Sequence, residues 1–200
     1  MRTLLGGGSP LNKFKETEKH LNRSLRTVFV DLQGDDVRGD GTIERPFSTV
    51  ERALKEGVGT ARTLKVMLND GDHESSLISV TDSVVVFDGT GRLKMTAAQE
   101  LLFYLNGAKL YIDVDVIDVS PVSYAAAVYM TSGCNLLVRG CTLALTQAKN
   151  FITNHSGQNN FYAGRCTITS TSSIPKVKGG SANSEPVAIN GVAATYTNLS

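Results

Sequence analysis

Short apolar segments recur through the middle of the chain at a nearly constant interval. Val85, Leu110, Leu136 and Phe161 occupy equivalent places in four such segments, and they follow one another at intervals of 25, 26 and 25 residues. Apolar side chains alternate with others inside each segment, which is the period of a β-strand. Short strands at a fixed interval, with no helical pattern between them, predict a solenoid of stacked β-coils.

The first 25 residues predict an arm followed by a helix. Residues 1–10 are rich in glycine and predict a flexible arm. Residues 11–25 predict a short amphipathic helix with an apolar stripe along one face. The residues of this stripe are Leu11, Phe14, Leu21 and Leu25. The stripe fits an oligomer seam, and it fits equally a helix lying on the end of its own domain.

A strand and a second short helix follow the predicted arm. Residues 26–32 alternate as a strand does, and residues 47–58 carry an apolar helical face. Ser48 followed by Glu51 predicts a capping box at the start of this helix, and Gly57 predicts its end. A helix at this place predicts a cap on one end of the solenoid, where strand edges are otherwise unpaired.

Beyond about residue 60 the pattern predicts strands and turns alone. The chain becomes polar after Ile168, which predicts a long loop or an irregular coil. A last pair of strands is predicted near residues 187–189 and 192–196. At about 25 residues a coil, this part of the chain holds about five or six coils.

These segments predict two parts of unequal size. Residues 1–25 form the arm and the attachment or oligomerisation helix. Residues 26–200 form the β-helix domain, with a cap at 26–60 and the coils at 61–200.

Composition narrows the class of protein. Hydrophobic residues are 41% of the chain and charged residues 20%, which is typical of a folded soluble domain. The net charge of +1 gives no basic field for nucleic acid, and no apolar run approaches the ~18 residues of a membrane span. The apolar start is too short for a signal peptide, which predicts folding in a cytosol. Cys141 and Cys166 lie one interval apart and predict small buried thiols.

The order of elements in the first half of the chain resembles a known family. A strand, a Gly/Asp-rich turn, a Pro-Phe-x-Thr helix, a strand and a glycine turn follow one another, as at the start of right-handed parallel β-helix proteins of the pectate-lyase-like superfamily. The segments that carry the resemblance are Val28-Phe29-Val30-Asp31, Gly39-Asp40-Gly41-Thr42, Pro46-Phe47-Ser48-Thr49-Val50, Val66-Met67-Leu68-Asn69-Asp70-Gly71 and Ser83-Val84-Val85-Val86-Phe87-Asp88-Gly89. The resemblance implies an all-β fold, a right-handed single-stranded parallel β-helix whose Pro-Phe-x-Thr helix closes one end of the stack.

The resemblance also suggests a setting for the protein. Such folds are common among bacteriophage tailspikes and tail fibres, and among polysaccharide lyases and hydrolases. We expect a virion structural protein of the tail, fibre or spike type, assembled in the host cytoplasm as a homotrimer. Residues 1–25 are expected to tether it to other virion proteins. The alternatives are a polysaccharide-degrading tailspike enzyme (a glycoside hydrolase or lyase) and a carbohydrate-binding module without catalysis. Five or six coils favour a compact scaffold over an enzyme with a long groove.

Alternation along the strands sorts the side chains into an inner and an outer face. The residues expected to point inward are Val85, Phe87, Leu110, Ile112, Leu136, Val138, Phe161 and Ala163. The outer face supplies the residues expected to meet a carbohydrate or a receptor. These are Asp88, Tyr111, Asp113, Asp115, Arg139 and Tyr162.

Three interpretations of this outer face remain open: a catalytic carboxylate pair, a carbohydrate-binding face and a solvated sheet face. Asp88 and Asp113 lie on neighbouring coils ~4.8 Å apart, close enough to share a proton or a cation. Glycoside hydrolysis needs paired carboxylates ~5–9 Å apart, and tyrosines stack on sugar rings. The simplest interpretation is a solvated sheet face whose acids are balanced by Arg139 and Lys109. No catalytic residue, metal ligand or cofactor is assigned from the sequence.

The remaining polar candidates predict ordinary surface. His73 and His155 fall in predicted loops and are expected to be exposed. Asp35, Asp36 and Asp40 cluster around glycines, and their spacing differs from that of an EF-hand loop, so a plain turn is expected there.

Overall fold

A computed structural model of the chain describes much of it from residue 25 onward. The described residues are 25–57, 63–95, 102–118, 126–131, 133–140, 142–144, 150–154, 160–164, 167–169, 176–178, 181–184, 187–189 and 192–194. Side chains are described as far as Thr142, except at 126 and 127. The predicted arm and most of the predicted first helix therefore lie outside the described residues.

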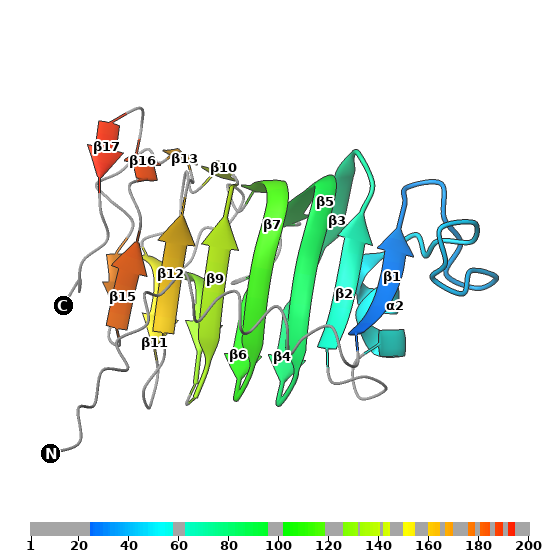
Figure 1. The fold of residues 1–200 in the computed structure, drawn as a ribbon, viewed down its shortest axis with the longest axis horizontal. Coiled ribbons are helices and arrows are strands. Elements are labelled where there is room, and N and C mark those ends of the chain that lie inside the picture. Colours follow the sequence, from blue (N-terminus) through cyan, green and yellow to red (C-terminus); the bar gives the residue numbers. More distant parts are fainter. Residues whose placement is uncertain are drawn as a thin grey trace, which may run out of the picture.

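Parallel strands dominate the described part of the chain, which confirms a β-rich fold (Figure 1). The strands form three stacks. The first stack consists of β1 (Leu25–Val30), β2 (Thr63–Leu68), the first half of β5 (Val84–Met95), the first half of β7 (Lys109–Asp118), β9 (Asn135–Arg139), β12 (Asn160–Gly164) and β15 (Ser181–Ser184).

The second stack begins at β3 and uses the second halves of the two long strands, β5 and β7. Its other members are β3 (Asp72–Ser75), β10 (Thr142–Ala144), β13 (Thr167–Thr169) and β16 (Val187–Ile189). A short strand, β17 (Val192–Ala194), pairs antiparallel with β16.

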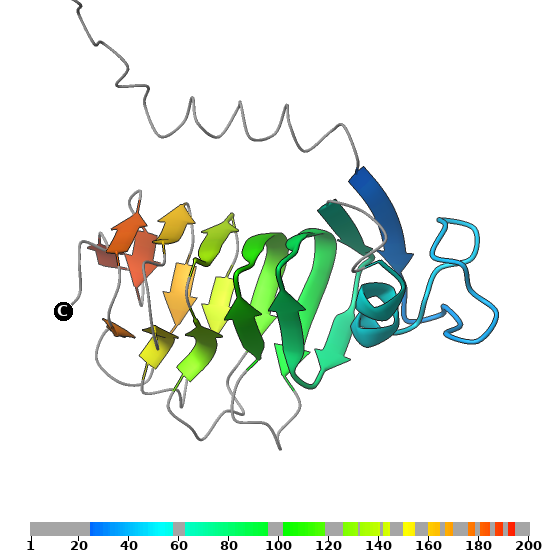
Figure 2. The same cartoon turned by 90° about the horizontal axis from the view of Figure 1, so that it is seen from below.

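The third stack forms a separate sheet that faces the first across the interior (Figure 2). Its members are β4 (Ile78–Thr81), β6 (Phe103–Asn106), β8 (Ala126–Met130), β11 (Asn150–Asn154) and β14 (Lys176–Lys178).

The predicted interval of about 25 residues matches the register in which the strands of the first stack pair. Val85 lies opposite Leu110, Leu110 opposite Leu136, and Leu136 opposite Phe161. Each strand thus hydrogen-bonds to a strand about one interval later, so a single sequence period places all of these residues in one row.

A glycine bends β5 and joins the first stack to the second. Gly89 has a φ of +115°, and a Cβ built on it would lie 2.2 Å from the carbonyl oxygen of Leu68. The pairing with β7 shifts register between Gly89 and Arg92. Only glycine fits a positive φ against so close a backbone, and the bulge turns the strand onto the neighbouring stack.

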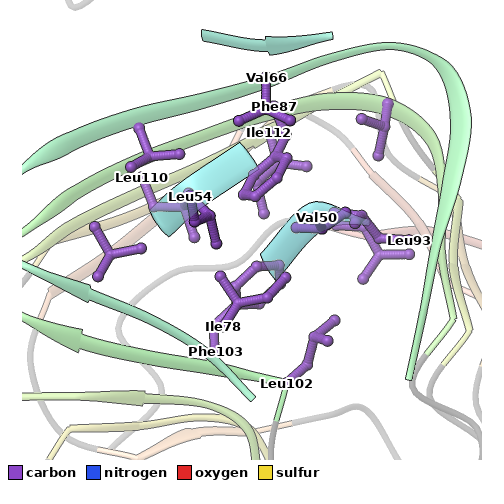
Figure 3. Close-up of a cluster of buried hydrophobic side chains, with 14 of the residues drawn as sticks. Val50, Leu54, Val66, Ile78, Phe87, Leu93, Leu102, Phe103, Leu110 and Ile112 are labelled. Atoms are coloured by element: carbon purple, nitrogen blue, oxygen red, sulfur yellow. The ribbon is translucent and has the colours of Figure 1, made fainter. Parts of the chain in front are cut away.

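The core fills the space between the stacks (Figure 3). The rings of Phe87 and Phe103, from the first and third stacks, lie 6.3 Å apart at 54°. The predicted inward residues of β5, β7 and β9 are all buried, which confirms that part of the face assignment. They are Val85, Phe87, Leu110, Ile112, Leu136 and Val138. The side chains of Phe161 and Ala163 lie outside the description.

The edge of β1 is covered by the loop that follows it. Phe29 N donates to Gly41 O at 2.9 Å, and Phe47 N donates to Phe29 O at 3.0 Å. Phe47 also forms a parallel bridge with Val30, so it lies in an extended segment ahead of the helix. These contacts satisfy edge groups of the first strand that would otherwise be open to another chain.

Helix α2 (Val50–Gly57) lies at the same end of the molecule, as expected for a cap (Figure 2). Val50, Ala53 and Leu54 point into the core. Along the described parts of the chain, no helix has both the length and the apolar character needed to cross a membrane.

The predicted capping box is wrong. The cap of α2 is Thr49, whose Oγ1 accepts a hydrogen bond from Arg52 N at 3.2 Å. Ser48 stands one residue too early for this role. Glu51 instead reaches the second stack, where its carboxylate accepts a hydrogen bond from Ser75 Oγ at 2.7 Å. A tertiary partner has displaced the local pairing that the sequence pattern predicted.

Asp36 ties the loop after β1 to the start of α2. Its Oδ1 accepts hydrogen bonds from Ser48 N and Thr49 N at 2.7 and 3.1 Å, and its Oδ2 accepts one from Thr49 Oγ1 at 2.5 Å. Arg52 Nε donates to Asp36 O at 3.0 Å, and the Arg52 guanidinium lies 5.0 Å from the centroid of the Phe47 ring. Burial favours the neutral acid, but the hydrogen bonds from Thr49 and Ser48 outweigh it and lower the pKa of Asp36.

Two further expectations change. Leu25 is the first residue of β1 and not the last residue of a helix. The polar segment after Ile168 is not only a loop, because β14 and β15 continue the third and first stacks there. Pairing with the preceding strand of each stack supplies the backbone hydrogen bonds, so these strands form without an apolar alternation of their own.

Replacing the Asp36 carboxylate is expected to loosen the cap. Asp36→Ala removes three hydrogen bonds to an ionised acceptor and should lower the free energy of unfolding by about 2–4 kcal/mol. Chemical denaturation followed by circular dichroism measures the loss. Asp35→Ala is the matched control, because Asp35 closes only an exposed turn; an equal loss in both variants would contradict the clamp.

The pH dependence of the free energy of unfolding tests the contribution of the negative charge on Asp36. Its folded pKa lies below the ordinary value of 3.8, so its contribution is complete above that value and is lost as the pH falls through the folded pKa. Asp36→Asn should therefore lose less stability than the wild type between pH ~4 and ~2. Parallel curves for the two proteins would refute this assignment.

Candidate functional site

The candidate site lies on the outer face of the first stack, on the side of its strands that points away from the core. Two neighbouring rows cross it. The first row is Lys65, Val86, Tyr111 and Leu137, and the second is Phe29, Met67, Asp88, Asp113 and Arg139. Each row is straight because its members share one register position.

The predicted acidic pair is brought together. Asp88 lies opposite Asp113 on adjacent strands. Arg139 stands next in this row, because Ile112 lies opposite Val138 one residue earlier.

The other two expected residues are placed less completely. Asp115 is exposed on the same side of β7 as Asp113, beside the register shift. The backbone of Tyr162 lies opposite Leu137, and the Tyr162 side chain is outside the description.

Lys65 neutralises one member of the acidic pair. Its Nζ lies 2.5 Å from Asp88 Oδ2, and Gly89 N donates to Asp88 Oδ1 at 2.7 Å. The sequence analysis missed Lys65 because it precedes Val86 in its row by 21 residues, which is shorter than the interval used to extend the rows. The positive charge that balances Asp88 therefore comes from Lys65, where Lys109 was expected to provide it.

Asp113 is the less well compensated acid. Partial burial and then repulsion from Asp88 raise the pKa of Asp113, while Arg139 and Lys65 oppose the rise. A Cβ built on Gly140, which has a φ of +69°, would lie 3.1 Å from Asp113 Oδ1, so glycine leaves room for this carboxylate. Asp113 therefore holds its proton more readily than an ordinary aspartate does.

Aromatic side chains lie on the outer faces of both the first and the third stack. Burial raises the pKa of Tyr111, which is half-buried in the first row. On the outer face of the third stack, Tyr104 and Tyr129 are stacked with centroids 5.9 Å apart and planes at 10°. This pair was missed, although its members are one 25-residue interval apart in the sequence.

His73 is not a surface residue. It lies in β3, only 2% of it is exposed, and its Nε2 lies 2.7 Å from Asn69 O. Asn69 Nδ2 in turn donates to Asp31 Oδ2 at 2.6 Å. Hydrogen bonds from Gln33 N and Asn69 lower the pKa of Asp31. These groups fasten the glycine turn after β2 to the end of β1. His155 lies outside the described residues.

Two aspartates of the first loop, Asp35 and Asp40, form turns as expected, whereas the turn prediction is wrong for Asp36, which binds the start of α2. Asp35 Oδ1 accepts hydrogen bonds from Val37 N and Arg38 N, and Asp40 Oδ1 accepts from Thr42 N and Oγ1. An open hollow of about 200 Å³ lies beside them and is remote in sequence from the acidic row. In the part of the chain with described side chains, no group of three or more His, Cys, Asp or Glu is placed to hold a metal ion.

Most residues of the expected attachment stripe fall in the part of the chain that the structure does not describe. Leu11, Phe14 and Leu21 lie outside the described residues. Leu25 is described, and 37% of it is exposed at the start of β1. Cys141 and Cys166 are also outside the description, and Cys134 is buried.

No protein-family model, curated protein or solved structure matches this chain. The chemistry open to the outer face follows from its groups alone. It offers a tyrosine, an ion-paired acid, an acid with a raised pKa and an arginine on a nearly flat sheet, which suits hydrogen bonding and stacking to a polar ligand.

Removing the charge of Asp113 is expected to leave the fold intact or to stabilise it slightly. Because the folded pKa is raised, the ionised carboxylate lowers stability as the pH rises above 3.8. Asp113 is exposed, so screening keeps the gain in Asp113→Asn at pH 7 below about 0.5 kcal/mol. Urea denaturation at low and high salt measures it, with Asp115→Asn as the matched control. A clear loss of stability in Asp113→Asn alone would contradict the assignment.

Proposed function

We propose that the chain is a small right-handed, single-stranded parallel β-helix of about five or six coils. Three features support this. Each of the three stacks gains one strand per interval, the core lies between the stacks, and α2 with the loop before it lies at one end. Right-handed crossovers between parallel strands are the strong general preference. The segments that resemble the pectate-lyase-like superfamily are the ones that build the closed end.

On this fold we propose a bacteriophage virion structural protein of the tail, fibre or spike type. The observation that carries the proposal is the closed first end of the stacked strands, which Gly41, Phe47 and α2 seal. The segments that build this end are the ones that resemble the pectate-lyase-like superfamily, whose folds are common among bacteriophage tailspikes and tail fibres.

We also propose how the domain assembles with other proteins. Residues 1–25 tether the domain to other virion proteins, and three copies form a homotrimer that is assembled in the host cytoplasm. The coils then serve as a compact spacer or as a contact to the host surface.

A carbohydrate-binding role without catalysis is the second candidate, and the tyrosines favour it. Tyr104 and Tyr129 form a stacked pair on one outer face, and Tyr111 lies among charged groups on another. Polysaccharide cleavage has less support, because Asp88 is held by Lys65 and Gly89 and is therefore not poised as a free nucleophile or base.

A virion role predicts that the chain is part of purified particles. Particles of the bacteriophage that encodes the chain, separated on a density gradient, should contain it at a constant ratio to the other structural proteins by quantitative mass spectrometry. A non-structural protein of the same phage serves as the control for carry-over. Absence of the chain from intact particles would remove the virion proposal.

A glycan role predicts binding that depends on the tyrosines. Surface polysaccharide from the host should bind the full chain in a calorimetric titration, and Tyr111→Ala or Tyr104→Ala should weaken binding by about fivefold, since a stacked ring contributes ~1 kcal/mol. Ser79→Ala, on the exposed side of β4, is the control. Unchanged affinity in both tyrosine variants would rule out both faces.

A further inference from the structure

The outer face of the first stack has an apolar row that no described element covers. Val86, Tyr111 and Leu137 lie in register on three adjacent strands and are only half-buried. Phe29 and Met67 adjoin them in the second row, also half-buried. Figures 1 and 2 show no described helix or strand lying over this face. Apolar side chains gathered in this way on a sheet indicate a surface that packs against something.

The chain itself enters the fold on this face. Leu25, the last residue of the apolar stripe, is the first residue of β1. Its side chain points outward with those of Thr27 and Phe29, because Val28 and Val30 point inward. The other residues of the stripe therefore lie in the segment of chain that leads directly into the first strand of this face.

We propose that residues 11–24 form a helix that docks across the outer face of the first stack in the same molecule. Fourteen helical residues extend ~21 Å. The four spacings from β1 to β9 extend ~19 Å at ~4.8 Å each. A helix laid across the strands thus reaches from Leu25 to Leu137, and its stripe lies on the apolar row.

Charged side chains also favour residues 11–24 as the segment that covers this face. Residues 11–24 contain two acidic residues and four basic ones, which are Lys13, Lys15, Lys19 and Arg23. The outer face beside the apolar row carries three acids, Asp88, Asp113 and Asp115, and three basic residues, Lys65, Lys109 and Arg139. Of the acids, Asp88 is paired with Lys65, whereas Asp113 and Asp115 make no ion pair within the described residues. Basic side chains flanking the stripe can meet these two acids across the contact.

The docked helix has a consequence for the candidate site. It covers Tyr111 and lies against Asp113, so a ligand of this face competes with it. It also keeps the apolar stripe away from other molecules until a partner takes its place. The docked helix follows from the outer face, its charges and the place where the chain enters it, and not from a virion role.

A single tryptophan tests the contact, because the chain has none of its own. In the full chain, Phe14→Trp places the probe in the stripe. We expect blue-shifted emission and an acrylamide quenching constant severalfold below that of the denatured chain, both unchanged over about a hundredfold dilution. Adding Tyr111→Glu should release the probe, whereas Tyr104→Glu, the same change on the third stack, should not.

Folding controls keep the test decisive. Each variant is compared by far-UV circular dichroism and unfolding midpoint, and Asp113→Lys provides a second route that leaves the apolar row intact and reverses the charge beneath the helix. Partial release of the probe in Asp113→Lys, reduced at high salt, supports the contact. Three results overturn it: an exposed probe at every concentration, burial that grows with concentration together with a rise in mass by light scattering, or burial that neither Tyr111→Glu nor Asp113→Lys alters.

Discussion

The edge of the first strand is the constraint on which the rest of this fold depends. A stack of parallel strands must begin somewhere, and its first member has backbone groups with no strand beside them. Here Gly41 and Phe47 fill those positions, and the Asp36 carboxylate holds the same loop to the start of α2. The helix can then place Val50 and Leu54 against the core instead of leaving the interior open. Every later strand is added to a surface that this arrangement has already completed.

The same stacking also determines what the outer faces can display. Because each strand repeats the register of the one before, a residue type at one sequence position becomes a row on the surface. Rows of like charge repel, and the acidic row is stabilised by Lys65 at one end and Arg139 at the other. Rows of rings reinforce each other, as Tyr104 and Tyr129 do. The features of interest on this protein are therefore properties of rows and not of single loops or a cleft.

Periodicity predicted the parts of the structure that periodicity controls. The interval placed Val85, Leu110 and Leu136 in one buried row and brought Asp88 beside Asp113. It failed where a partner distant in sequence decides the outcome. Glu51 left its local cap for Ser75, and His73 occupies an inward position opposite Leu93, at the head of an otherwise apolar row. Lys65 was missed because the connection that follows it, from β2 to β5, is shorter than the 25-residue interval, so its ion pair with Asp88 depended on a length that only the fold reveals.

The closed end described above also gives the chain an order of folding. The β1 edge, its covering loop and α2 lie within one short stretch near the start of the sequence, so they form with little loss of loop entropy. Each later strand of a stack finds its partner about 25 residues back, and this separation does not grow along the chain. The sequence separation of paired strands therefore stays moderate, although the stacks are built from parallel pairings. A ribosome releases this closed end before the later strands, so each later strand can pair with one that has already been synthesised.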